Sequence, residues 1–174
     1  VFDNKSPSLR PPVGDWALPD MAGPDTDTGS AAGKCEVICF TADHGQSFKD
    51  LSTERIRVLL EAWIDRTREL SKEKFIHHIT PFENRGEEVG VTLAHPHGQI
   101  YAYSYIPPKV SRMLEVAKKH KERTGKVLFD EIVAREIKDE ERIVAENKHW
   151  VAYVPYAARY SFEIHVAPKV SVAD

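Results

Sequence analysis

The chain has 174 residues, of which 41% are hydrophobic and 29% are charged. This length and composition are typical of a globular protein with one hydrophobic core, so we expect a single domain over residues 1–174. The 27 acidic residues outnumber the 24 lysines and arginines, which excludes the strongly basic surface of a nucleic-acid-binding protein. No apolar run approaches the roughly 20 residues that span a bilayer, so we expect no membrane partner.

The first half of the chain is predicted to contain a loop, two strands and a helix. Residues 7–34 are rich in Pro, Gly, Asp, Ser and Thr and lack an apolar period, which predicts a long mobile loop. Residues 35–40 and 75–82 have the composition of strands. Between them, Ser52 is a typical helix N-cap, and apolar residues at helical spacing predict a helix that ends at about Ser71.

The second half alternates strands with helices. Pro107 and Pro108 are expected to end a strand that begins near His95. Two helices and three short strands are predicted after it, over residues 110–123, 127–138, 142–146, 150–154 and 162–166. Sequential short strands with helices between them predict an α+β fold, with a mostly antiparallel sheet and flanking helices.

The most informative motif is the run His-Pro-His-Gly-Gln at residues 95–99. It is bounded by β-branched and aromatic residues, so we expect the histidines to lie on or beside a strand. In an extended segment, alternate residues point to one face, which would place His95, His97 and Gln99 in one row. Such a row could bind a metal, attack phosphorus or hold an anion, and the motif alone leaves these alternatives open.

The cysteines and the remaining histidines carry little functional signal. Cys35 and Cys39 would lie about 13 Å apart on a strand, too far to share a zinc ion, so we expect buried structural thiols. Two cysteines are too few for a disulfide framework, which indicates a reducing, cytoplasmic compartment. Structural roles are expected for His77, His78, His120, His149 and His165.

The motif also occurs in a specific combination with other segments. Phe-Glu-Asn-Arg-Gly at residues 82–86 precedes it, and the segments 1–4, 39–44 and 146–163 continue the pattern. In this combination the chain resembles the N-terminal half of the galactose-1-phosphate uridylyltransferase family, a branch of the histidine-triad superfamily. The resemblance implies a histidine-triad-like nucleotidyltransferase domain. Because the chain begins with Val1, we expect that an upstream part of the family fold is absent from it. The resemblance also implies that the second, C-terminal domain of the family fold is absent.

The resemblance implies a two-step transfer of a uridylyl group. His97 would attack the α-phosphorus of UDP-glucose, and galactose 1-phosphate would then take the group from the histidine to give UDP-galactose. A backbone carbonyl beside His95 is expected to hold the proton on the other nitrogen of the His97 ring. Hydrolytic relatives carry a third histidine where this chain has Gln99, and an amide does no acid–base chemistry near pH 7, so transfer is favoured over hydrolysis.

Further substrate-binding residues follow from the same match. Asn84 and Thr92 resemble the positions that contact the phosphates, while Gly86 and Gly90 would let backbone amides approach the diphosphate. Asn4 resembles the asparagine that meets the nucleotide. The run at residues 84–86 is also compatible with a plain turn.

The match implies one metal site and argues against another. His44 and His95 correspond to two histidines that hold a structural zinc ion with a Cys-x-x-Cys pair, which we expect outside this chain. His44 is also compatible with an exposed turn. Met113 stands where the family has an iron-binding glutamate, so an iron site is not expected.

The resemblance also leaves the partner and the exact reaction open. It implies a homodimer or an assembly with a C-terminal half. Two alternatives remain: another nucleotide-sugar nucleotidyltransferase or phosphorylase of the superfamily, or a non-catalytic half that needs a partner chain.

Overall fold

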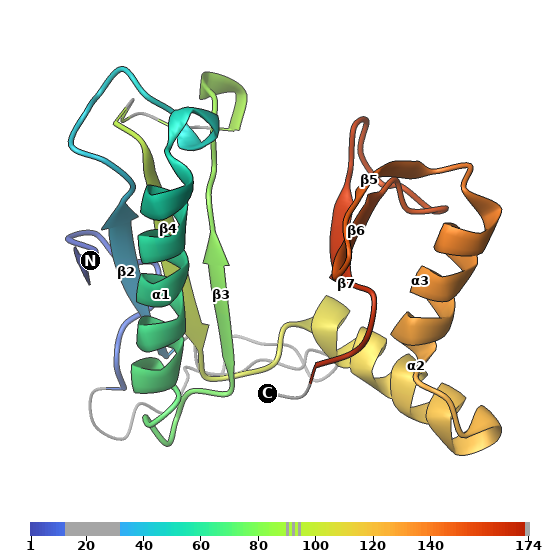
Figure 1. The fold of residues 1–174 in the computed structure, drawn as a ribbon. Helices are drawn as coiled ribbons and strands as arrows, with labels where there is room; N and C mark the ends of the chain where they lie inside the picture. Colours follow the sequence, from blue (N-terminus) through green and yellow to red (C-terminus); the bar gives the residue numbers. More distant parts are fainter. Residues whose placement is uncertain (13–31, 90, 92, 94, 173–174) are drawn as a thin grey trace. The chain divides into compact units, whose positions relative to one another are not determined.

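The computed structural model describes residues 1–12, 32–89, 91, 93 and 95–172, and the chain divides into two compact units, Val1–Pro107 and Pro108–Asp174. Each unit contains its own sheet, with four strands in the first and three in the second (Figure 1). All strand pairs within these sheets are antiparallel, which confirms the predicted α+β class. The single domain expected over 1–174 stays a prediction, since each unit is described by itself.

The first unit is a four-stranded sheet with one long helix. The strands lie in the order β1-β2-β4-β3, which places β4 between β2 and β3. Its elements are β1 (Phe2–Asp3), β2 (Gly33–Cys39), the short helix η1 (Phe48–Asp50), α1 (Thr53–Leu70), β3 (His78–Phe82), the short helix η2 (Glu87–Val89) and β4 (His97–Tyr103).

Helix α1 covers one face of this sheet (Figure 1). Its N-cap is Ser52, whose hydroxyl accepts a hydrogen bond from the backbone N–H of Arg55 at 3.2 Å, as the sequence predicts. Leu59 packs against the buried Phe40 of the segment after β2, and Leu70 packs against Ile100 of β4. The helix therefore buries the face of the sheet that carries Ile38 and Ile100.

An ion pair joins the same helix to the sheet. The guanidinium of Arg66 donates two hydrogen bonds, of 2.8 and 2.6 Å, to the carboxylate of Glu36 on β2. The Glu36 side chain is only 7% exposed, so the pair satisfies a carboxylate that would otherwise be buried without a partner.

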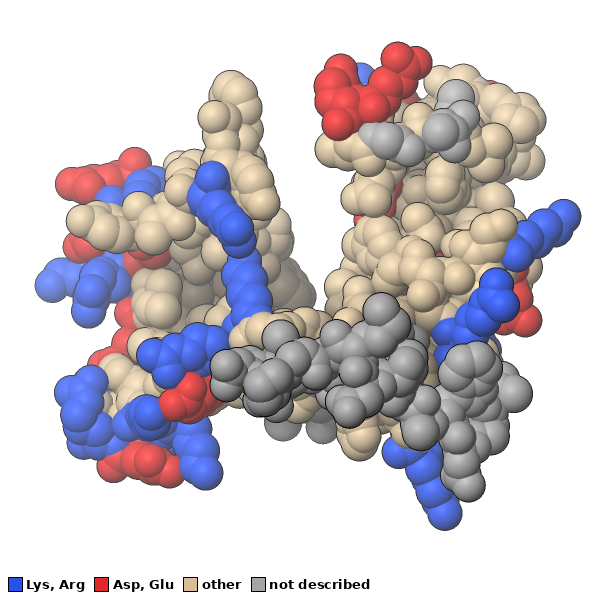
Figure 2. All heavy atoms as spheres, turned by 180° about the vertical axis from the view of Figure 1, so that it is seen from behind, with Lys and Arg blue, Asp and Glu red and all other residues tan. Residues whose placement is uncertain are grey.

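The outer face of the sheet carries the motif residues. Along β4, Gly98, Ile100 and Ala102 are buried toward α1, so His97 and Gln99 point to the other face. Figure 2 views the molecule from that side, where uncharged residues occupy most of the first unit's surface and charged side chains lie mainly at its margins.

The second unit combines two helices with a three-stranded sheet in the order β5-β6-β7. Its core joins Val133 of α3 to Val151 and Tyr153 of β6, while α2 has no buried residue. Its elements are α2 (Pro108–Thr124), α3 (Leu128–Asp139), β5 (Ile143–Glu146), β6 (Trp150–Tyr153) and β7 (His165–Pro168).

Several strands begin at other residues than the sequence predicts. The loop expected over 7–34 lies largely in residues 13–31, outside the described part, but Gly33 and Lys34 belong to β2 because they pair with Tyr103 and Ala102 of β4. The strand predicted at 75–82 begins only at His78.

The last strand is also displaced from its predicted range of 162–166. It runs from His165 to Pro168 because that register pairs it with β6. Phe162 lies outside it, with a positive φ of 62°. No helix of the described residues is both long and apolar enough to cross a membrane.

Candidate active site

The site is built around His97, the first residue of β4. Its Nδ1 lies 2.7 Å from the backbone carbonyl oxygen of His95. A carbonyl oxygen only accepts hydrogen bonds, so Nδ1 must carry the proton in the neutral ring. Nε2 then keeps its lone pair, and no described residue hydrogen-bonds to it. This is the tautomer that a nucleophilic imidazole requires.

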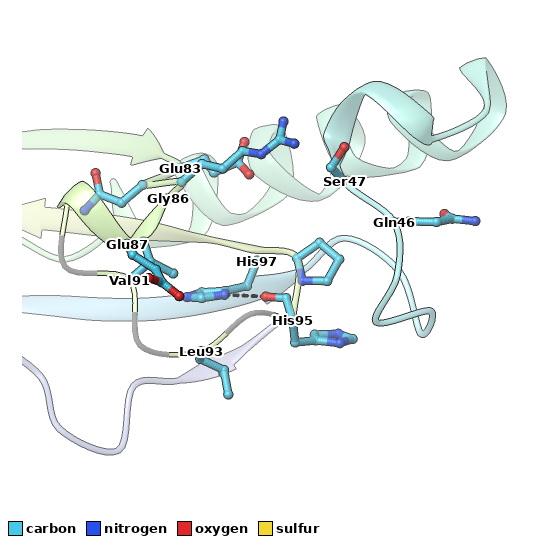
Figure 3. Close-up of a pocket in the computed structure, with 12 residues that line it drawn as sticks. Gln46, Ser47, Glu83, Gly86, Glu87, Val91, Leu93, His95 and His97 are labelled. Carbon is cyan, nitrogen blue, oxygen red and sulfur yellow. Dashed lines mark hydrogen bonds between the residues drawn. The ribbon is translucent and has the colours of Figure 1, made fainter.

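The row of three side chains expected for the motif is broken at His95. His95 and Pro96 precede β4, and only His97 and Gln99 share a face of the strand. In Figure 3 the rings of His95 and His97 point in opposite directions. The physical reason is that Pro96 lies outside the β4 ladder, and its carbonyl accepts a hydrogen bond of 3.0 Å from the N–H of Phe40 instead.

Gln99 lies two residues beyond His97 and is partly buried. Its side-chain oxygen Oε1 accepts a hydrogen bond of 3.3 Å from Nδ2 of Asn4, which follows β1. The structure thus brings together Asn4, His97 and Gln99, three of the residues that the sequence singled out, although they are up to 95 positions apart.

Gly98, between His97 and Gln99, is required by close packing. A Cβ at this position would lie 2.9 Å from the Phe82 carbonyl oxygen and 2.9 Å from a ring carbon of Phe40. Only glycine lets β4 approach both neighbours, so the backbone that carries His97 and Gln99 is held tightly on both sides.

A pocket of about 270 Å³ opens beside His97. Asn84, Gly86, His95 and His97 line it, and Figure 3 shows the His97 ring directed toward the segment that carries Gly86. Gly86 has a φ of 102°, a conformation that L side chains rarely adopt, so a glycine is needed at this turn. The predicted roles of Gly90 and Thr92 fall outside the described residues.

Sequence reasoning missed part of the pocket wall. Gln46, Ser47, Glu83 and Arg85 also line the pocket. Arg85 could have been found from its place between Asn84 and Gly86. Gln46 and Ser47 had no comparable signal, because the loop that carries them reaches the site only through the fold.

That loop is held by hydrogen bonds between Ser47 and Asp50. The backbone N–H and the hydroxyl of Ser47 donate hydrogen bonds of 2.9 and 2.6 Å to Asp50. These hydrogen bonds lower the pKa of the Asp50 carboxyl, and the positive charges of Lys49 and Arg85 lower it further. The carboxylate is therefore ionised at neutral pH and anchors the loop beside the pocket.

The two histidines expected to bind a metal do face each other. Nδ1 of His44 lies 2.8 Å from Nδ1 of His95, and the ring centroids are 4.4 Å apart. Imidazole nitrogens are common zinc ligands, so this close approach of two ring nitrogens fits the expected metal role. No group of three or more His, Cys, Asp or Glu side chains suited to a metal occurs among the described residues. The described part of the chain thus offers two ligands at this point.

An imidazole whose Nε2 has no hydrogen-bond partner among the described residues, beside a pocket, has the arrangement that covalent group transfer requires. The family model described as "Galactose-1-phosphate uridyl transferase, N-terminal domain" matches residues 3–107. The chain belongs to this family.

Relatives and solved structures agree with that assignment. The chain is 45% identical to a galactose-1-phosphate uridylyltransferase of Streptomyces lividans, over 100% of this chain and 44% of the relative. It is 40% identical to the enzyme of that name from Thermotoga maritima, over 99% and 53%. The chain therefore spans about half the length of the curated relatives it matches.

Two solved structures show the same fold. A uridylyltransferase structure aligns with a TM-score of 0.84 and 31% identity, over 97% of this chain and 52% of that one. An ADP-glucose phosphorylase from Arabidopsis thaliana, with bound ADP-glucose, aligns with a TM-score of 0.74 and 29% identity, over 84% and 45%.

Proposed function

We propose that the chain contributes the nucleophile of a hexose-1-phosphate uridylyltransferase, which moves a uridylyl group from UDP-glucose to galactose 1-phosphate. The observation that carries this proposal is the 2.7 Å contact between His97 Nδ1 and the His95 carbonyl, which leaves Nε2 free to attack. The relatives of this family carry the matching name.

The proposed reaction has two displacements at the same phosphorus. In the first, the Nε2 lone pair of His97 forms a bond to the α-phosphorus of UDP-glucose, and the bond to the bridging oxygen breaks. Glucose 1-phosphate leaves with that electron pair. In the second, a phosphate oxygen of galactose 1-phosphate attacks and the phosphorus–nitrogen bond breaks. The proton stays on His97 Nδ1 throughout, where it is donated as a hydrogen bond to the carbonyl oxygen of His95.

Gln99 would donate a hydrogen bond from its amide to a phosphoryl oxygen. An amide neither gives up nor takes a proton near pH 7, so it cannot activate a water molecule against the uridylyl-histidine. This supports transfer to an acceptor sugar phosphate over hydrolysis. Asn84 and Gly86, on the pocket wall, are proposed to contact the phosphates, and the same role is proposed for Gly90 and Thr92.

We further propose that His44 and His95 hold a structural zinc ion, completed by a pair of cysteines from outside this chain. Tetrahedral ligands about 2.0 Å from zinc lie roughly 3.3 Å apart, so the two Nδ1 atoms at 2.8 Å would need to separate only slightly. When bound, the zinc ion would cross-link the two segments that flank the pocket. An iron site stays unexpected, since Met113 offers a thioether where a hard carboxylate is needed.

We also propose that the site is completed by other chain segments, from a second subunit or from a C-terminal half. The half-length match to the relatives supports this proposal. We also propose a cytoplasmic location. The support for it is that both cysteines are free thiols, one of them buried, as is usual in a reducing compartment.

A labelling experiment tests the proposed reaction. The chain, alone and mixed with the C-terminal half of a relative, is incubated with UDP-glucose or ADP-glucose labelled on the α-phosphate. We expect label on the protein from UDP-glucose, and we expect galactose 1-phosphate to release it as UDP-galactose. Label from ADP-glucose alone would instead favour a phosphorylase related to the Arabidopsis thaliana protein. Label that requires the added half would show that the site is shared.

A further inference from the structure

Gln99 can serve the reaction only if its amide is oriented correctly. A glutamine side chain ends in an oxygen that accepts and a nitrogen that donates, and the last torsion has a broad, roughly two-fold preference. The backbone of Gln99 is fixed, because it pairs with Val37 of β2 on one side and Phe82 of β3 on the other. The rotation of the amide itself is left for another residue to determine.

Asn4 has an orientation that follows from an unambiguous donor. Its Oδ1 accepts a hydrogen bond of 2.9 Å from the backbone N–H of Ser6. A backbone N–H can only donate, so the oxygen of Asn4 must face Ser6 and its nitrogen must face the other way. The backbone N–H of Asn4 also donates to the carbonyl of Cys35 at 2.9 Å, which fixes the residue against β2.

The nitrogen of Asn4 reaches Gln99. Nδ2 of Asn4 lies 3.3 Å from Oε1 of Gln99 in a partly buried position. Because Asn4 presents a donor, Gln99 must present its acceptor there. The Gln99 NH2 group is then turned away from Asn4, and no described residue accepts from it. The donor face of Gln99 is thus left for a ligand.

We propose that Asn4 is a positioning residue that orients the Gln99 amide for the phosphoryl group, through a chain of hydrogen bonds that begins at the backbone of Ser6. This inference rests on the proposed function of Gln99. It assigns Asn4 a role that acts through another side chain, whereas the sequence comparison implied only contact with the nucleotide.

Two substitutions of Asn4 separate the possible causes of a defect. Asn4→Leu removes the donor to Gln99 with similar size and no charge. Asn4→Asp also removes the donor but keeps an oxygen that accepts from Ser6, so the turn at the start of the chain is retained. We expect both variants to slow uridylylation of His97 by about tenfold or more. If only Asn4→Leu slows uridylylation, the defect comes from the lost turn at Ser6 and not from the lost donor to Gln99, and the proposal would be overturned.

A double-mutant cycle tests whether Asn4 acts through Gln99. In a Gln99→Ala background, Asn4→Leu should change the rate of uridylylation by less than about twofold. A tenfold loss that persists in this background would show that Asn4 acts on the substrate directly, and the positioning role would be wrong.

Side-chain amide NMR provides a readout that does not depend on activity. The chain contains only two glutamines and three asparagines, so its spectrum of amide NH2 groups is simple, and Gln99→Ala identifies the Gln99 pair. Asn4→Leu should shift the Gln99 pair and leave the Gln46 pair in place. Unmoved Gln99 resonances would overturn the proposal. If Asn4→Leu shifts the Gln99 resonances but the unmodified protein shows no uridylylation, the hydrogen bond between Asn4 and Gln99 is supported and the proposed function is refuted.

Discussion

Gly98→Ala should both destabilise the first unit and slow the uridylylation of His97. The added Cβ would lie 2.9 Å from the Phe82 carbonyl oxygen, which belongs to the backbone of the neighbouring strand. It would also lie 2.9 Å from the ring of Phe40, which is fully buried and cannot easily turn away. Overpacking of this kind costs about 1–3 kcal/mol of unfolding free energy. Because β4 itself must shift, the rate of His97 uridylylation should fall as well.

Urea unfolding followed by circular dichroism measures this cost. Gly45→Ala is a matched control, because its Cβ would meet only the Asp43 carboxylate at 3.4 Å, an ordinary contact distance. We expect the control to change the unfolding free energy by less than about 0.5 kcal/mol. If Gly98→Ala unfolds at the same urea concentration as the unmodified protein, the packing argument for β4 is wrong.

Three other predictions follow from the contacts of the first unit. Arg66→Met leaves the Glu36 carboxylate buried without its partner, so the unfolding free energy in urea should fall by about 2–3 kcal/mol; an unchanged value would show that the pair contributes nothing. Hydrogen bonding to Ser47 lowers the pKa of Asp50, so this interaction stabilises the fold above about pH 4 and is lost as the pH falls through the lowered pKa. Asp50→Asn should remove this contribution to the pH dependence of the unfolding free energy in acid, and an unchanged pH dependence in the variant would contradict the role of Asp50. His44→Ala should abolish zinc retention, measured by elemental analysis of the assembled protein, whereas retention at the original stoichiometry would exclude His44 as a ligand.

Local sequence patterns predicted the presence of helices and strands better than the residues at which they begin and end. Helix α1 follows directly from the Ser52 cap and its apolar spacing, and it begins and ends within a residue of the prediction. The start of β2 at Gly33 and the displacement of β7 depend on pairing with distant strands, which no local window contains. Register is a property of the sheet, so it became visible only in the structure.

The same distinction applies to the site. The pairing of His97 and Gln99 on one face follows from the two-residue period of a strand, so the sequence predicted it. The contact between Asn4 and Gln99 joins residues 95 positions apart and arises from the order of the strands in the sheet. The turn of His95 toward His44 likewise depends on a loop whose path the local sequence did not reveal.

The central claim is that Nε2 of His97 becomes covalently uridylylated. Mass spectrometry of the protein, incubated with UDP-glucose together with the chain segments that complete its site, tests this claim directly. The account predicts one acid-labile uridylyl adduct, located on His97 by peptide mapping, and none on a His97→Gly variant. A uridylyl adduct that persists on the His97→Gly variant, or that maps to another residue, would contradict it.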